Sequence, residues 1–86
     1  MTDLVVLTEY LVKRLVLDQD SVLVKEVSRD ENSITIQVLV EEKDMPVVIG
    51  KGGATINAIR TIVQASSYIN KKERVFINVD SKEKED

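Results

Sequence analysis

The stretch VVIGKGGATINAI, residues 47–59, contains all three glycines of this 86-residue chain within four positions. Gly50, Gly52 and Gly53 surround Lys51, and apolar residues flank the group on both sides. Glycine adopts positive φ angles at little cost and lets another backbone approach closely, because it has no Cβ atom. The stretch therefore predicts a tight turn between two hydrophobic segments, with the ammonium group of Lys51 at its tip.

The residues on either side of the glycines predict two helices. Asp44 is a suitable N-cap and Pro46 suits a first helical turn, so a very short helix is expected before Gly50, which ends it as a left-handed cap. Residues 54–69 predict a second helix, which Gly53 opens. The expected buried face of this helix consists of Ile56, Ile59, Ile62 and Val63.

Two phosphate-binding motifs do not fit the glycines. The P-loop requires a Gly-Lys-Ser/Thr ending, which the stretch does not have. A dinucleotide-binding pattern that begins at Gly50 requires glycine at position 55, where the chain has Thr55. The remaining interpretation is a tight loop that joins two helices and has glycine at its first and last positions. In it, the N–H groups that begin the second helix and the charge of Lys51 attract an anion such as a sugar-phosphate backbone.

Residues 3–17 predict an N-terminal helix. Thr2 or Asp3 can cap its start, and Glu9 and Lys13 are one turn apart and can pair. Packing in the core explains its apolar stripe best, and a partner surface on the outer side is the alternative. The stripe is wide and consists of Leu4, Val5, Val6, Leu7, Tyr10, Leu11, Val12, Leu15 and Val16.

Three strands are expected. Residues 22–29 are β-rich but alternate loosely, which favours a bulge or an edge position. Residues 34–41 have apolar side chains at every second position from Ile34 to Val40, and the short turn between the two segments predicts an antiparallel hairpin. Residues 74–80 predict the last strand, with Val75, Ile77 and Val79 on one face; the direction of Phe76 is left open.

The predicted element order is α-β-β-α-α-β. We expect an α+β domain in which a three-stranded sheet is covered on one face by three helices. The domain is expected to span residues 1–80. Residues 81–86 have no apolar side chain and are expected to form a disordered charged tail.

The composition argues against an enzyme. The chain has no cysteine and no histidine, which excludes thiolate chemistry and removes the usual general base and the commonest transition-metal ligand. Ser66 and Ser67 therefore lack an imidazole to activate them, and neither a cofactor nor a metal site is predicted. No segment is apolar enough to span a bilayer, and the first residues lack the basic region of a signal peptide, so a reducing cytoplasm is the expected location.

The glycine turn and its apolar frame resemble a known family. The run VIGKGGATINAIR is similar to the VIGxxGxxIxxI signature of the KH domain, an RNA-binding fold whose GXXG loop clamps about four nucleotides. Gly50 and Gly53 match the two fixed glycines, and Lys51 and Gly52 are the variable pair. The element order resembles the bacterial, type II arrangement of the family. The single-domain format resembles the small bacterial KH proteins of the KhpA type.

This resemblance implies a site for single-stranded RNA around the GXXG loop, residues 50–53. It also implies that Arg60 lines the groove or pairs with a carboxylate. Ala54 and Asn57 stand where relatives often carry a basic residue, which predicts weak affinity for RNA alone. The expected apolar floor for the bases consists of Val48, Ile49 and Ile56. The full set of implied RNA-binding residues is Val48, Ile49, Gly50, Lys51, Gly52, Gly53, Ala54, Ile56, Asn57, Arg60, Lys71, Lys72 and Arg74.

The distribution of charge is compatible with such a site, although the net charge is −3. Residues 1–42 carry four basic and nine acidic side chains, whereas residues 43–74 carry six basic and two acidic ones. The positive charge is thus confined to the segment that holds the loop, and the local charge is what attracts a nucleic acid.

Two functions remain in competition. The resemblance implies a single-stranded RNA-binding protein that acts as an RNA chaperone or post-transcriptional regulator with a larger KH protein of the KhpB/Jag type. A lone KH surface covers few nucleotides, so pairing raises avidity, and a homodimer is another arrangement left open. The alternative is a protein–protein interaction module that uses a KH fold without strong RNA affinity and docks through its apolar N-terminal helix. No membrane partner is expected in either case.

Overall fold

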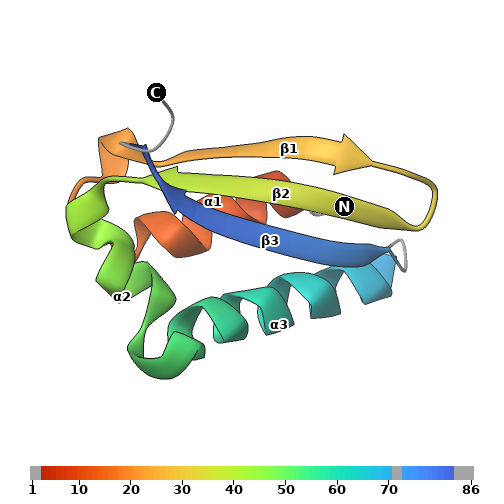
Figure 1. Ribbon diagram of the computed structural model, residues 1–86. Coiled ribbons are helices and arrows are strands. Elements are labelled where there is room, and N and C mark those ends of the chain that lie inside the picture. The colour runs from red at the N-terminus through yellow and green to blue at the C-terminus, as the bar shows by residue number, and fades with distance from the viewer. Residues whose placement is uncertain (1–2, 71–72, 83–86) are drawn as a thin grey trace.

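The apolar alternation of residues 34–40 places this segment at the centre of the sheet. A computed structural model describes residues 3–70 and 73–82 of the protein. Strand β2 (Ser33–Val40) pairs antiparallel with β1 (Leu23–Arg29) and parallel with β3 (Arg74–Ser81), in the order β1-β2-β3 (Figure 1). Because β2 has a neighbour on each side, its inward side chains are deeply buried. Those that are at most 1% exposed are Ile34, Ile36, Val38 and Val40.

The hairpin between β1 and β2 is closed by an aspartate. Oδ1 of Asp30 accepts the backbone N–H groups of Asn32 and Ser33, both at 2.8 Å. The hydrogen bond from Asn32, followed by the weaker effect of the one from Ser33, holds the pKa of the Asp30 carboxyl below its usual range. The pairing register shifts between Glu26 and Ser28. The predicted hairpin, bulge and edge position of the first strand are therefore confirmed.

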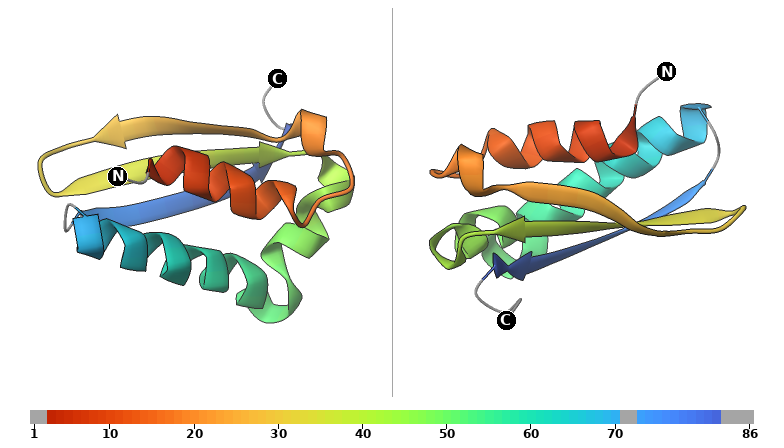
Figure 2. Two further views of the ribbon diagram at one scale, coloured as in Figure 1. Left: turned by 180° about the vertical axis from the view of Figure 1, so that it is seen from behind. Right: turned by 90° about the horizontal axis from the view of Figure 1, so that it is seen from above.

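Three helices lie over one face of the sheet. Helices α1 (Leu4–Lys13) and α3 (Ala54–Asn70) pack side by side on that face, and the short α2 (Met45–Ile49) leads from the end of β2 into α3 (Figure 1 and Figure 2). Each helix contributes a fully buried valine to one core cluster with the sheet, namely Val12, Val48 and Val63. The predicted α+β order is confirmed. Single 3-10 turns lie at Gln19–Ser21, Glu42–Asp44 and Lys51–Gly53.

The described part of the chain contains no helix that is both long enough and apolar enough to cross a membrane.

Helix α1 starts as the sequence predicts. The Asp3 carboxylate accepts the N–H groups of Val5 at 2.8 Å and Val6 at 3.3 Å, which caps the helix. The expected pair of Glu9 and Lys13 is formed, with Oε2 and Nζ 3.1 Å apart. Both features are local, and both follow from residue spacing alone.

The end of α1 differs from the prediction, because a distant residue binds the chain that follows. The helix stops at Lys13 and not near residue 17, and Leu15, expected in its apolar stripe, is 38% exposed. The carboxylate of Asp44, which is 2% exposed, accepts the N–H of Leu17 at 3.1 Å and that of Asp18 at 3.3 Å. Asp44 occupies the predicted N-cap position of α2, but its side chain makes no capping bond there.

Two further expectations are corrected at the end of the chain. Ile62, predicted in the buried face of α3, is 49% exposed, because the buried face follows Ile59, Val63 and Ser67. Strand β3 extends to Ser81, one residue into the predicted tail, and residues 83–86 lie outside the described residues. The expected face of β3 is confirmed, since Ile77 is 2% exposed whereas Phe76 points the other way and is 48% exposed.

Candidate nucleic-acid interface

Gly50 ends α2 in a conformation that only glycine adopts readily. Its φ is 77° and its ψ is 170°, and its N–H donates to the carbonyl of Pro46 at 2.8 Å. A Cβ atom at this position would lie 2.7 Å from the backbone nitrogen of Thr55. The expected left-handed cap is wrong in detail, because the φ is positive but the ψ is extended. The need for glycine at position 50 is thus both conformational and steric.

The next three residues form a 3-10 turn whose tip faces solvent. The N–H of Gly53 donates to the carbonyl of Gly50 at 3.1 Å, and Gly52 is left-handed, with φ 64° and ψ 18°. Lys51 and Gly52 are exposed, and α3 begins at Ala54, directly after the turn. The turn therefore presents the Lys51 ammonium group beside the N-terminus of α3, the end of a helix at which the dipole carries partial positive charge.

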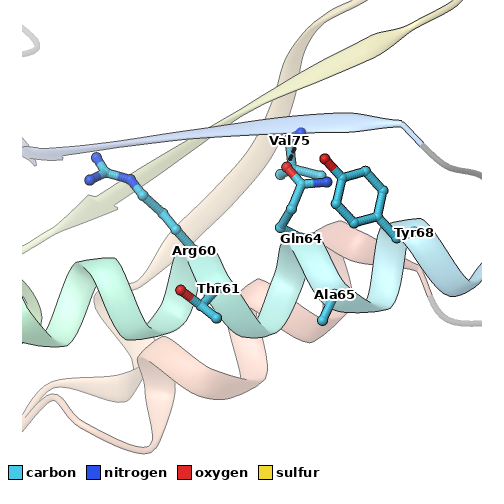
Figure 3. A pocket seen from close by; sticks show the side chains of 6 residues that line it. All are labelled: Arg60, Thr61, Gln64, Ala65, Tyr68 and Val75. Atoms are coloured by element: carbon cyan, nitrogen blue, oxygen red, sulfur yellow. Dashed lines mark hydrogen bonds between the residues drawn. The ribbon is translucent and has the colours of Figure 1, made fainter.

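A row of side chains connects α3 to the free edge of the sheet. Arg60, Gln64 and Tyr68 follow one another at intervals of four residues and point from the helix toward β3 (Figure 3). Strand β3 has a neighbour on one side only, so alternate residues turn their N–H and C=O groups toward α3. The row covers part of this edge.

Arg60 binds the edge through its guanidinium group. Nε and Nη2 donate to the carbonyl oxygen of Ile77 at 3.3 Å and 2.9 Å, and Nη1 donates to Oδ1 of Asn57 at 3.0 Å. Arg60 was expected either to line the groove or to pair with a carboxylate, and the described residues offer it no carboxylate partner. The side chain lies between α3 and β3, and its guanidinium is bonded to Asn57 on the helix and to Ile77 on the strand.

Gln64 occupies the next position along the same edge. Its Nε2 donates to the carbonyl of Glu73 at 2.8 Å, and its Oε1 accepts the N–H of Val75 at 2.9 Å. The hydroxyl of Ser67 donates to the same Glu73 carbonyl at 2.8 Å. These bonds satisfy backbone groups that would otherwise lack partners at the start of the edge strand.

An open hollow lies between the row on α3 and the start of β3. Its volume is about 440 Å³, and it is lined by Arg60, Thr61, Gln64, Ala65, Tyr68 and Val75 (Figure 3). The polar ends of Arg60 and Gln64 are engaged with the strand, so most of the remaining lining is aliphatic or aromatic. The hollow is thus largely apolar, and the Arg60 guanidinium points away from Gln64 and Tyr68 (Figure 3).

The structure separates the predicted site residues into two groups. Gly50, Lys51, Gly52 and Gly53 form the turn, and Ala54, Asn57 and Arg60 are exposed on α3 beside it. The predicted apolar floor is wrong for Val48 and Ile56, which are 0% and 4% exposed, because both face the core beneath the turn. Ile49 is half-buried.

The basic residues expected near the last strand do not gather at the turn. Arg74 begins β3 at the far end of α3 from the turn, and its guanidinium lies 5.8 Å from the centre of the Phe76 ring. Both side chains belong to the sheet face that points away from the helices. Lys71 and Lys72 lie outside the described residues.

Most residues of the hollow, Gln64 and Tyr68 among them, were absent from the predicted site. Gln64 and Tyr68 lie four and eight residues after Arg60, so the helical period was a signal for them once Arg60 was placed in the groove. The sequence offered no signal that the Gln64 amide bonds the edge of β3.

Comparison with known proteins identifies this arrangement. Residues 6–80 match the family model described as the KH domain of KhpA/KhpB. The chain belongs to the KhpA/KhpB KH-domain family. It is 38% identical over 73 residues to the RNA-binding protein KhpA of Caldanaerobacter subterraneus. The aligned region spans 85% of this chain and 95% of that protein. The identity and both spans are the same for the RNA-binding protein KhpA of Clostridium acetobutylicum.

Two solved structures share the fold of this chain. The chain superimposes on Era in complex with MgGDPNP and nucleotides of 16S ribosomal RNA with a TM-score of 0.69, at 18% identity. A variant of Aquifex aeolicus Era bound to GDP.AlF4- gives a TM-score of 0.68, also at 18% identity. In each case the match covers 91% of this chain but 29% of the Era chain, so it concerns the fold alone. The KhpA/KhpB family is non-enzymatic, in agreement with the prediction that this chain is not an enzyme.

Proposed function

We propose that this KhpA/KhpB-family domain binds single-stranded RNA. The observation that carries the proposal is the exposed Lys51-Gly52 tip of the turn beside the N-terminus of α3, the helix whose side chains run along the edge of β3. The relatives named RNA-binding protein KhpA, aligned over 85% of this chain, support it. The domain selects single strands because bases must leave their stack to enter a groove beside a sheet edge.

The turn holds the phosphates and the groove receives the bases. Lys51 and the backbone N–H groups at the start of α3 contact one or two phosphates, which positions the strand without reading its sequence. The bases then point toward β3. Few phosphates are neutralised, so binding is weak, and log K falls by about 0.7 per log unit of salt for each phosphate contacted.

We further propose that the domain acts with a partner of the KhpB type, as an RNA chaperone or post-transcriptional regulator in the cytoplasm. The family model joins KhpA and KhpB, which supports this pairing. A second RNA-binding surface on the partner raises the effective concentration of the strand at the turn, which offsets the weak binding of a single domain. A homodimer gives the same advantage.

The test reverses the charge at the tip of the turn. Lys51→Asp is expected to lower the affinity for a labelled single-stranded RNA of mixed sequence roughly ten-fold, because it replaces attraction to a phosphate by repulsion. Fluorescence anisotropy at low ionic strength measures the affinity. Lys25→Asp is the matched control, since Lys25 is exposed on β1, the opposite edge strand from β3.

Equal losses in the two variants would mean that only net charge matters and would contradict the proposal. Circular dichroism of both variants checks that the fold is intact.

One observation favours the second candidate, a protein-interaction module. Apolar side chains on α1 and α3 point to solvent, among them Val6 at 58% and Ile69 at 83% exposed. Exposed apolar residues on two helices that pack side by side are typical of a docking surface. If Lys51→Asp leaves RNA binding unchanged while Val6→Asp abolishes co-purification of a KH-domain partner from cells, this second function is correct and the first is not.

A further inference from the structure

The sheet has a second face, which no helix of the described residues covers. The helices pack on the face that carries Ile36 and Ile77, which are neighbours in the register of β2 and β3. Thr35 and Phe76, one position earlier on each strand, are also neighbours and therefore point to the opposite face. That face is turned toward the viewer in Figure 1, and Figure 2 shows the helices together on the other side. Side chains on this open face are therefore accessible to a ligand.

Phe76 places an aromatic ring on the open face. It is the only phenylalanine of the chain, and it is 48% exposed. The guanidinium of Arg74, two residues earlier on the same strand, lies 5.8 Å from the centre of the ring, within the range of a cation–π contact. Aromatic rings and guanidinium planes both stack on unpaired bases. The pair thus presents two planar groups that suit the flat face of a nucleobase.

The charge of Arg74 is not neutralised within the described part of the chain. Arg74 forms no ion pair with a described carboxylate, whereas Arg29 pairs with Glu26 and Glu73. On the open face of β2 and β3 the one acidic residue is Asp80, six residues beyond Arg74 and so about 20 Å farther along the strand. The charge next to the ring is therefore positive and favours an anionic ligand.

The side chains around the ring favour a nucleic acid over a protein. Thr35 lies beside Phe76 on β2 and Asn78 lies two residues beyond it on β3, and neither side chain forms a hydrogen bond with another described residue. Both can therefore bind base edges or sugar hydroxyls. Phe76 is the only large apolar side chain that β2 and β3 expose, which is too little for the apolar core of a stable dimer.

Strand β3 joins the open face to the proposed RNA site. At its free edge Arg60 donates to the carbonyl of Ile77, and the residues before and after Ile77 turn to the open face. A polynucleotide that leaves the turn along α3 therefore reaches Phe76 by passing over β3 alone, without crossing β1 or β2.

We propose that the open face around Arg74 and Phe76 is a second contact surface for single-stranded RNA. Phe76 stacks on one base, and Arg74 binds an adjacent phosphate. The inference rests on the proposed function and extends the bound strand beyond the turn. Arg74 begins β3 at the end of α3 that lies away from the turn, about 25 Å along the helix. Only an RNA longer than the roughly four nucleotides that a GXXG loop clamps therefore reaches both surfaces.

The experiment measures the anisotropy of labelled oligouridines of four and twelve nucleotides. Phe76→Leu keeps an apolar side chain on the strand but removes the ring. The dodecamer is therefore expected to bind roughly five-fold more weakly, and the tetramer is expected to bind as before. Tyr10→Leu is the matched control, because it removes an exposed ring from α1, on the other side of the sheet. Both affinities are expected to stay unchanged in this control, and circular dichroism checks the fold of each variant.

The salt dependence of binding tests the contact between Arg74 and a phosphate. Arg74→Gln is expected to reduce the slope of log K against log salt for the dodecamer by about 0.7, the contribution of one phosphate on a single strand. Arg74→Lys is the control, since it retains the charge and is expected to retain the slope.

Three results would overturn the second surface. They are a Phe76→Leu variant that binds the dodecamer as tightly as the unmodified domain, an equal loss for the tetramer, and an unchanged slope in Arg74→Gln. A self-associated domain that Phe76→Leu dissociates in sedimentation would also overturn it, because the face would then be an interface between copies. In each case a tetramer affinity that still falls in Lys51→Asp keeps the proposed function. No binding of either oligomer, with or without a KH-domain partner, would overturn the proposed function itself.

Discussion

The two edges of the sheet solve the same problem in different ways. An edge strand exposes unpaired N–H and C=O groups that invite pairing with other chains. On β1 the protection is general, because Lys25, Glu26 and Arg29 are exposed and the bulge between Glu26 and Ser28 disturbs the edge. On β3 it is specific, because the side chains of Arg60 and Gln64 form hydrogen bonds with individual backbone groups.

The difference indicates which edge is suited to a ligand. Charges and a bulge repel other strands wherever they occur, so many sequences protect β1 equally well. The β3 edge needs particular side chains at particular positions on α3, and it leaves a hollow between them. Substitutions are therefore expected to have larger and more local effects at β3 and at the turn that sets α3 against it than at β1.

The largest effect is expected at Gly50, whose conformation fixes the path from α2 into α3. Gly50→Ala forces a side chain into a φ of 77° and against the Thr55 backbone. The expected loss is about 2–4 kcal/mol of unfolding free energy, a large fraction of the stability of a domain of this size. Urea denaturation followed by circular dichroism measures it.

Gly52→Ala is the matched control for Gly50, since a Cβ at Gly52 meets no atom within 4 Å and only its positive φ opposes the change. Its expected cost is about 1 kcal/mol. If the two alanine variants are equally stable, the steric part of the argument is wrong.

An intermediate effect is expected at Gln64, which covers the start of the β3 edge. Gln64→Leu leaves the N–H of Val75 without a partner and removes one hydrogen bond to the Glu73 carbonyl. The expected loss of unfolding free energy is about 1–2 kcal/mol. The Val75 amide is expected to exchange with deuterium faster in the variant, and hydrogen exchange followed by NMR measures this. Gln37→Leu on β2 is the control, because the described residues offer the Gln37 side chain no hydrogen bond. Unchanged protection of Val75 would mean that Gln64 does not protect the edge.

The smallest effect is expected at the hairpin that joins β1 to β2, and it depends on pH. The folded state holds the pKa of Asp30 below its usual range through the N–H groups of Asn32 and Ser33. The stabilisation is therefore present above the ordinary pKa of an aspartate and is lost as the pH falls through the lower, folded value. Asp30→Asn keeps an accepting oxygen but does not titrate.

Urea unfolding of the unmodified domain and of Asp30→Asn, at neutral pH and at about pH 3, measures this contribution. The unmodified domain is expected to lose more stability on acidification than Asp30→Asn, since all other carboxyl groups are common to both. Identical losses would show that the hairpin bonds do not depend on the charge.

Local patterns predicted most of the fold. The alternation of residues 34–40 identified the central strand, and Asp3 and the Glu9–Lys13 pair marked α1, because each feature depends on residues a few positions apart. The early end of α1 could not be predicted in the same way, since it follows from hydrogen bonds to Asp44, more than twenty residues away.

The candidate site was predicted less completely than the fold. The glycine turn and Arg60 were found because glycine and charge are conspicuous in the sequence. Val48 and Ile56 were misplaced because an apolar residue beside a loop can serve a ligand or the core, and only packing decides between them. Gln64 was missed because a neutral amide on a helix shows its role only when its partner strand is in place.

The parallel pairing of β2 with β3 has a consequence for synthesis of the chain. Ser33 lies beside Arg74, so about 40 residues, including the turn and all of α3, separate the paired positions. A ribosome has therefore exposed the hairpin and the turn before the strand that completes the groove emerges. Under the proposed function, an unfinished nascent chain presents Lys51 but lacks the edge of β3, so the RNA-binding surface is complete only after the last strand is released.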